Sequence, residues 1–238
     1  MILEALEWCA TPASWRARSQ GFLAAQIAIR HRRQRCAGHW RPHLEESRRF
    51  IEEQVAADTG GPREHVLVLG GGHLNDVDPE FLDRTFRRIT LVDVVHPIEV
   101  QLRCLLSRGR WSCVSADLAA PDPRILALVQ NASWVFSTCL LSQLPLGHPP
   151  ESAPAILGRH LELLRSARRA VLITDAARRF SPTEDWSALW EGVALPGASE
   201  TWVWRLAPPE EHGDPGRGCE ERRVEACVLG ADLPPSVV

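Results

Sequence analysis

Residues 65–76 read His-Val-Leu-Val-Leu-Gly-Gly-Gly-His-Leu-Asn-Asp, an apolar run that ends in three glycines. A short continuous apolar run is typical of a strand that is buried on both faces, as in a parallel sheet. Glycine after such a strand permits backbone angles that other residues resist, and it lets a ligand approach the main chain closely. The stretch therefore predicts the first strand of an α/β domain, followed by a ligand-binding loop at Gly70, Gly71 and Gly72.

Apolar runs that predict further strands follow at regular intervals, at about 89–95, 111–114, 133–138 and 170–174. Helices are expected to begin near Asp78 and Pro97 and to fill about 153–166. The helix from Pro97 has an apolar face that we expect to lie on the sheet, formed by Ile98, Leu102, Leu105 and Leu106. This alternation predicts a parallel sheet with right-handed crossovers and helices on both faces.

The two ends of the chain depart from this alternation. Residues 200–205 and 221–228 have strand-like composition, and a loop rich in proline and glycine joins them, which predicts an antiparallel pair that completes the sheet. Near the N-terminus, helices are predicted over about 21–36 and 42–57. We therefore expect a helical N-terminal cap over residues 1–60, followed by a Rossmann-like α/β domain over residues 61–238.

The composition excludes several classes of protein. The chain has 238 residues, 45% of them apolar, and a formal net charge of -3, so its overall charge indicates neither nucleic acid nor a membrane as partner. No apolar run reaches the roughly 18 residues that a membrane-spanning helix needs, and residues 1–10 do not resemble a signal peptide. Seven scattered cysteines without a CxxC pair favour reduced thiols over disulfides or a zinc site. These features predict a cytoplasmic protein without a metal ion.

The glycine loop and the strand that follows it resemble the first motifs of the class I S-adenosylmethionine-dependent methyltransferases. Gly70 and Gly72 match the Gly-x-Gly loop of that family. Asp93, at the end of the second strand, matches the acidic residue that binds the ribose hydroxyls, a role that suits a carboxylate because it accepts from both. The resemblance covers about residues 63–228 and implies S-adenosylmethionine as the cofactor.

The resemblance continues beyond the third and fourth strands. Asp117 matches the acidic residue that accepts from the adenine amino group, and Leu118 is expected to pack on the adenine ring. In the fourth strand, Ser137 occupies the region where the family lines its methyl-donor pocket. The acceptor site of the family begins just after this strand.

Three positions near the glycine loop depart from known patterns. The family usually has an acidic residue two positions before the first glycine, where this chain has Val68, and often a third glycine, where it has Leu74. The amino group of the methionine tail is then expected to bind Asp76 or a backbone carbonyl. A dinucleotide fingerprint starting at Gly70 needs a further glycine at the position of Asn75, which disfavours a nicotinamide dinucleotide.

Histidines are the candidates for a general base, because an oxygen or nitrogen acceptor needs proton removal near neutral pH. His73, His39 and His148 are the first candidates, followed by His43 and His96. His73 is equally consistent with a solvent-facing turn residue. The spacing of His39 and His43 would suit two metal ligands on one helix, but a proline lies between them and no HExxH pattern exists, so packing or capping is favoured.

Two further features have both a functional and a structural interpretation. The arginines in residues 15–20 and 30–35 suggest either a lid that presents guanidinium groups to an acidic acceptor or a solvated helix face. Trp186 and Trp190 have helical spacing and suggest either the wall of an acceptor pocket or core residues.

These observations together favour an S-adenosylmethionine-dependent methyltransferase that acts on a small molecule. Two alternatives stay open. The missing acidic residue at Val68 and the lack of an Asn-Pro-Pro-type motif after the fourth strand are also consistent with a cofactor-binding regulatory protein that needs a partner chain. A nicotinamide-dependent oxidoreductase is the third interpretation, and Asn75 argues against it.

Overall fold

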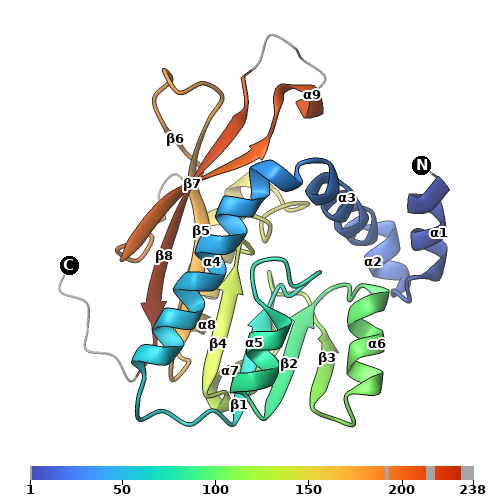
Figure 1. Ribbon diagram of the computed structural model, residues 1–238, viewed down its shortest axis with the longest axis vertical. Helices are drawn as coiled ribbons and strands as arrows, with labels where there is room; N and C mark the ends of the chain where they lie inside the picture. Colours follow the sequence, from blue (N-terminus) through green and yellow to red (C-terminus); the bar gives the residue numbers. More distant parts are fainter. Residues whose placement is uncertain (1, 191–192, 213–217, 232–238) are drawn as a thin grey trace.

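The computed structural model describes residues 2–190, 193–212 and 218–231. The strands in these ranges are β1 (His65–Leu69), β2 (Arg88–Asp93), β3 (Trp111–Ser115), β4 (Trp134–Thr138), β5 (Ala170–Arg179), β6 (Ser187–Ala188), β7 (Glu200–Ala207) and β8 (Glu220–Leu229). They form one sheet in the order β3-β2-β1-β4-β5-β8-β7, with the short β6 paired to β5 (Figure 1).

The first five strands of this sheet are parallel to one another. β8 then pairs antiparallel with β5, and β7 pairs antiparallel with β8. The predicted Rossmann-like sheet with an antiparallel C-terminal pair is therefore confirmed. The strand order reverses between β1 and β4, and in open α/β sheets the ligand binds at this switch point, beyond the carboxyl ends of the strands.

The helices are α1 (Ile2–Ala10), α2 (Trp15–Ser19), α3 (Phe22–Arg35), α4 (Ala37–Ala57), α5 (Pro79–Thr85), α6 (Ile98–Leu106), α7 (Pro123–Asn131), α8 (Ala153–Arg165) and α9 (Pro209–His212), with a short 3-10 turn at Pro150–Ser152. α5 and α7 begin in the same way: the side chains of Asp78 and Asp122 accept from backbone N–H groups of the first turn, and proline follows each of them. α7 was not among the predicted helices, although Asp122-Pro123 repeats the signal of Asp78-Pro79.

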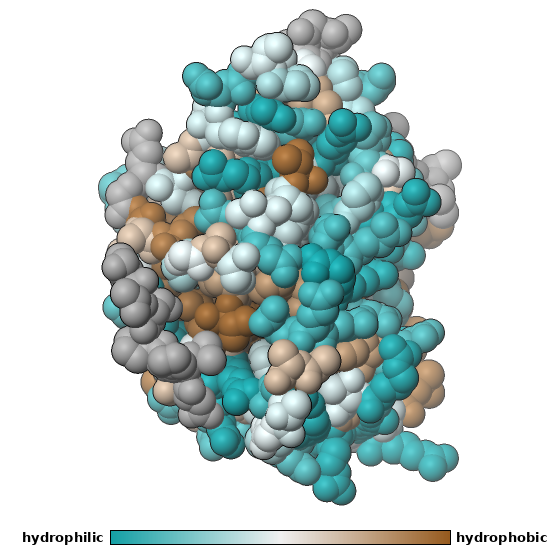
Figure 2. Space-filling view, turned by 60° about the vertical axis from the view of Figure 1, so that its left-hand side comes forward, coloured by the Kyte–Doolittle hydropathy of each residue, from teal (hydrophilic) through white to brown (hydrophobic). Residues whose placement is uncertain are grey.

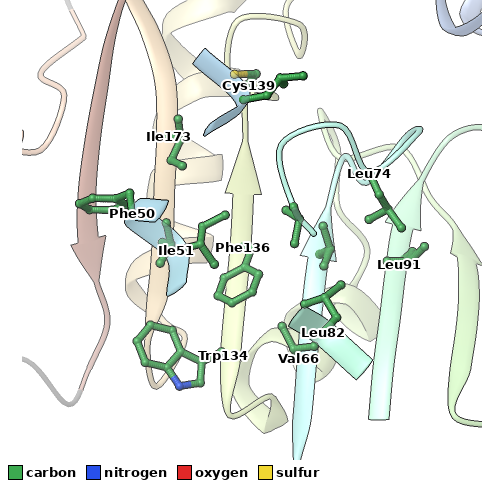
Figure 3. Packing of buried hydrophobic residues seen from close by; sticks show 14 of the residues in the cluster. Phe50, Ile51, Val66, Leu74, Leu82, Leu91, Trp134, Phe136, Cys139 and Ile173 are labelled. Carbon is green, nitrogen blue, oxygen red and sulfur yellow. The ribbon is translucent and has the colours of Figure 1, made fainter. Parts of the chain in front are cut away.

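The sheet is covered by apolar clusters on both faces. Side chains of β1 alternate between them, with Val66 and Val68 in one cluster and Leu67 and Leu69 in the other. α4 belongs to the first cluster: Figure 3 shows its Phe50 and Ile51 beside side chains of β4 and β5. α1, α2 and α3 pack separately, with Ala17, Leu23, Ile27 and Val95 at the centre of a smaller cluster. Of the residues before Gly61, α4 therefore shares the core of the sheet.

The apolar face predicted for the helix after Pro97 is not the buried one. Leu102, Leu105 and Leu106 of α6 are 50%, 78% and 77% exposed. The side of α6 that meets the core carries Val100, which is buried, and Cys104, which is partly buried. This side lies roughly opposite Leu102 on the helix. α6 lies beside β3 at the edge of the sheet, where only one side of the helix meets the core (Figure 1). Its leucines therefore face solvent.

The surface of the protein is mainly hydrophilic on the face drawn in Figure 2. Figure 2 shows a face covered mainly by hydrophilic residues, with hydrophobic residues gathered in a limited area. Within the described ranges, no helix combines the length and the apolar character needed to cross a membrane.

Candidate functional site

The glycine loop turns sharply at the carboxyl end of β1. Gly70 and Gly72 have φ angles of +68° and +41°, in the region that favours glycine. A Cβ on Gly70 would lie 2.8 Å from the side chain of Leu140, whereas a Cβ on Gly71 would meet its neighbours at ordinary distance. The backbone N–H of Gly72 donates to Oδ2 of Asp93 at 2.9 Å. The loop is thus tied to the end of β2, as the predicted site requires.

The Asp93 carboxylate is held by main-chain donors. Oδ1 accepts from the N–H of Val94 at 2.7 Å, and Oδ2 accepts from Gly72. The side-chain amide of Gln26, from α3, lies 3.4 Å from Oδ2. Burial raises the pKa of Asp93, while the backbone N–H groups and His96 oppose this shift. Burial also lowers the pKa of His96.

A cavity of about 440 Å³ lies beside Asp93. Its walls come from the ends of β2 and β3, from α6 and from the connection between α1 and α2. The residues that line it are Pro12, Ala13, Ser14, Val94, Val95, His96, Gln101, Cys113 and Ser115. The predicted ribose-binding carboxylate is therefore next to a space that the N-terminal helices help to enclose.

The cap also contacts the second predicted carboxylate. Arg16, in α2, forms an ion pair with Oδ2 of Asp117 at 3.0 Å. Gln26 lies over the glycine loop, where a Cβ on Gly72 would be 3.2 Å from its Oε1. Two side chains of the cap thus lie on the carboxylates that the sequence analysis assigned to the cofactor.

Two predicted cofactor residues lie in the core. Ser137 is fully buried in β4, and its hydroxyl forms a hydrogen bond of 2.9 Å with Nε2 of His160. Leu118 is 4% exposed and belongs to the apolar cluster on the α7 and α8 side of the sheet. The sequence placed both near the correct strand ends, but the direction of each side chain depends on packing.

The three predicted catalytic histidines are separated. Nδ1 of His73 lies 2.8 Å from a carboxylate oxygen of Glu99, and Nε2 lies 3.2 Å from the carbonyl oxygen of Gln26. Both partners, a carboxylate and a backbone carbonyl, accept hydrogen bonds only, so neither ring nitrogen of His73 faces a proton that it could remove. His39 is exposed in the first turn of α4, and His148 is exposed in the loop after β4. In this arrangement His73 joins α3 to α6.

His43 is the histidine that the fold brings to the glycine loop. It is completely buried, and its Nε2 lies 3.0 Å from Oδ1 of Asp76 and 3.6 Å from Sγ of Cys139. The indole N–H of Trp202, in β7, donates to Nδ1 at 3.0 Å. The imidazole also stacks on Trp204, with ring centroids 4.2 Å apart. Figure 3 shows Cys139 just beyond the end of β4.

His43, Asp76 and Cys139 have the donor atoms of a zinc site, and these atoms lie within 4.8 Å of one another. The donor and acceptor roles of the His43 ring nitrogens disfavour a metal ion here. Because the Trp202 indole N–H donates to Nδ1, the neutral ring carries its proton on Nε2, whereas a metal ion would need the Nε2 lone pair. His39 and His43, whose spacing alone would suit two metal ligands, do not share a site, because His39 is exposed and His43 is buried.

The arginine run and the tryptophan pair have structural partners. Arg30 pairs with Glu7, and Arg35 makes a two-point contact with Glu211. Trp186 and Trp190 lie on either side of the short strand β6. Their spacing of four residues would suit a helix, but the chain is not helical there. The indole N–H of Trp190 donates to the carbonyl of Asp175.

Two residues of the site carried no signal in the sequence. Gln26 meets Asp93 across 67 positions, and Trp202 meets His43 across 159. Cys139 lies just after the fourth strand, where the family resemblance implies the acceptor site. A lid was one of two interpretations of the stretch that contains Arg16, but nothing in the sequence indicated its partner Asp117, which is 101 positions away.

No protein-family model matches the chain, and no curated protein matches it. Matches to solved structures exist at low identity. A magnesium protoporphyrin IX methyltransferase from Synechocystis PCC 6803, with bound S-adenosylhomocysteine, is 15% identical; the match covers 79% of this chain and 83% of that chain, with a TM-score of 0.46. A 1,6-didemethyltoxoflavin-N1-methyltransferase from Burkholderia thailandensis is 14% identical over 77% and 78% of the two chains, with a TM-score of 0.45.

The matches also include another class of enzyme. A structure titled as a putative Zn-dependent alcohol dehydrogenase from Rhodobacter sphaeroides is 18% identical, over 50% of this chain and 43% of that chain, with a TM-score of 0.35. At these identities the similarity concerns the fold. The Rossmann-like α/β fold of the chain is shown by its own strand order and strand directions.

Proposed function

We propose that the chain is an S-adenosylmethionine-dependent methyltransferase that acts on a small molecule. The observation that carries this proposal is the contact between the Gly72 N–H and the Asp93 carboxylate, 2.9 Å long, beside the switch point of the sheet. Asp117 follows the neighbouring strand β3. Some of the methyltransferases in the matched structures hold S-adenosylhomocysteine, a ligand of the same class.

The residues present fit an adenosine cofactor. Gly70 and Gly72 turn the loop with positive φ angles and put no Cβ atoms on it, and Asp93 offers a carboxylate to ribose hydroxyls. The cavity of about 440 Å³ beside Asp93 has room for the nucleobase. Asp117 would accept from the adenine amino group. When bound, the cofactor supplies an electrophilic methyl group on a sulfonium sulfur, and the contribution of this chain is to hold and align the reactants.

The cap has to release both carboxylates before they can bind a nucleoside. With Gln26 in place, each Asp93 oxygen already has two donors nearby, since Val94 and Val95 face Oδ1 and Gly72 and Gln26 face Oδ2. Withdrawal of Gln26 frees one acceptor position, and withdrawal of Arg16 frees Asp117. We therefore propose that the N-terminal helices open to admit the cofactor and close again over the acceptor.

Calorimetric titration with S-adenosylmethionine, S-adenosylhomocysteine and NAD(H) tests the proposed function. Both sulfur nucleosides should bind, and Asp93→Ala should weaken them by about 1–3 kcal/mol, because charge-assisted hydrogen bonds are lost. Asp185→Ala, which changes an exposed carboxylate in the loop before β6, is the matched control. Binding of NAD(H) without either sulfur nucleoside would refute the proposal. Binding of the product without methyl transfer to any metabolite pool would favour a non-catalytic cofactor-binding protein.

A further inference from the structure

A buried series of hydrogen bonds connects the last part of the sheet to the glycine loop. It runs from the Trp202 indole through the His43 imidazole to the Asp76 carboxylate, and we refer to these three residues as the relay. The relay joins β7, α4 and the segment after β1. His43 is completely buried, and stacking on Trp204 holds its ring plane. Its geometry is therefore set by packing on several sides.

The chemistry of tryptophan gives the relay a direction. An indole N–H can only donate, so Nδ1 of His43 must accept, and the neutral imidazole carries its proton on Nε2. This N–H points to Oδ1 of Asp76 at 3.0 Å. The Nε2–H donor therefore holds the Asp76 carboxylate in place through Oδ1.

The residue before Asp76 offers an unused acceptor, while the Arg48 guanidinium donates to the backbone carbonyl of Asn75 at 2.7 Å. Oδ1 of the neighbouring Asn75 is buried and has no hydrogen-bond partner among the described residues. Burial raises the pKa of the Cys139 thiol well above its usual value, and the negative charges of Asp76 and Asp175 act in the same direction. The sulfur beside the relay is therefore a neutral thiol. A carboxylate next to an unused acceptor suits a ligand group that donates several hydrogen bonds and carries a positive charge.

Asp76 also lies at the correct end of the loop for such a group. The glycine loop contacts Asp93, at the end of β2, on one side, and Asp76 lies near Cys139, just beyond β4, on the other. β1 lies between β2 and β4 in the sheet. A ligand whose ribose binds Asp93 therefore extends along the loop toward Asp76 with the rest of its length.

We infer that the relay of Trp202, His43 and Asp76 binds the α-ammonium group of the methionine tail of the cofactor, with Asp76 as the direct contact and His43 and Trp202 as positioning residues. The inference rests on the proposed function. In the family that the chain resembles, an acidic residue before the loop is usual, but Val68 stands there as an apolar side chain fully buried in the core. The inference assigns the binding of the ammonium group to Asp76, after the loop, instead. The segment could take over this role because α4 and β7 supply the support that holds Asp76.

Two probes that differ only at the amino-acid tail test this inference. S-adenosylhomocysteine carries the ammonium group, and 5′-methylthioadenosine has the same nucleoside and sulfur but no amino-acid group. Asp76→Asn should weaken S-adenosylhomocysteine about 10- to 100-fold in calorimetry and 5′-methylthioadenosine less than about twofold, because only the former loses a charged contact. We take the affinity for S-adenosylhomocysteine divided by that for 5′-methylthioadenosine as the affinity ratio. His43→Phe and Trp202→Phe should reduce this ratio about three- to tenfold.

The ratio separates positioning from structural damage, since a variant that only distorts the loop weakens both probes alike. Glu45→Gln, an exposed change on the same helix as His43, is the control and should leave the ratio unchanged. An unchanged ratio in Asp76→Asn would overturn the inference while leaving the proposed function intact. If the unaltered chain binds neither probe, the proposed function and this inference both fail.

Discussion

The buried pair of Ser137 and His160 predicts how the protein loses stability in acid. His160, in α8, is 1% exposed, and its Nε2 bonds the Ser137 hydroxyl. Burial lowers the pKa of His160 from 6.5 to about 4. As the pH falls, the unfolded chain therefore takes up this proton before the folded chain does. The contribution of His160 to stability is intact above about pH 6.5 and is lost as the pH falls toward about 4.

The size of this loss follows from the shift in pKa. One pKa unit corresponds to about 1.36 kcal/mol, so the full loss below the folded-state pKa is about 3 kcal/mol. Between pH 7.5 and pH 4.5, we expect His160 to account for a decrease of about 2–3 kcal/mol in the free energy of unfolding. His65 and His96, whose pKa values burial also lowers, add to the total acid sensitivity of the protein.

A comparison with His160→Gln isolates this contribution. Glutamine can bond the Ser137 hydroxyl but does not titrate, and the other histidines act equally in both proteins. Urea unfolding at several pH values should show the wild type losing about 2 kcal/mol more than His160→Gln between pH 7.5 and pH 4.5. His148→Gln, at an exposed position, should follow the wild type. Parallel curves for the wild type and His160→Gln would refute this reasoning.

Three further predictions concern the cap, the loop and a cysteine pair. Arg16→Ala removes the ion pair on Asp117, so calorimetry should show S-adenosylhomocysteine binding about two- to fivefold more tightly; weaker binding would contradict displacement of Arg16. Gly70→Ala places a residue with a Cβ at a φ of +68°, and thermal unfolding should show a decrease of about 1–3 kcal/mol in the free energy of unfolding; an unchanged stability would contradict this prediction. The sulfurs of Cys104 and Cys113 lie 2.9 Å apart, so hydrogen peroxide should oxidise them to a disulfide while it is reduced to water; peptide mapping that finds both thiols still open to alkylation would rule this out.

The strands and the helix starts were predictable because their causes are local. The run at 65–69 and the later apolar runs have the length and composition of buried strands, and each became a strand within a few residues of the predicted ends. The antiparallel pair at the C-terminus was also predicted. The helix at 123–131 was not predicted, although its start, Asp122-Pro123, has the same local signal as Asp78-Pro79.

The buried side of a helix was less predictable. The apolar spacing of Leu102, Leu105 and Leu106 defines a face, but α6 lies at the edge of the sheet and turns Val100 inward instead. In the same way, Ser137 was placed at the right strand but points into the core toward His160. Periodicity identifies which side chains share a side, and the neighbouring elements decide which side is buried.

The sequence by itself determined the Rossmann-like sheet, the glycine loop after its first strand and the aspartates that follow the next two, because each depends on a pattern within a few residues. Only the tertiary structure decided which side chains meet those aspartates. Arg16 reaches Asp117 across 101 positions, and Trp202 reaches His43 across 159. Such contacts arise when distant elements pack on one sheet, and that packing depends on the whole core rather than on any local spacing.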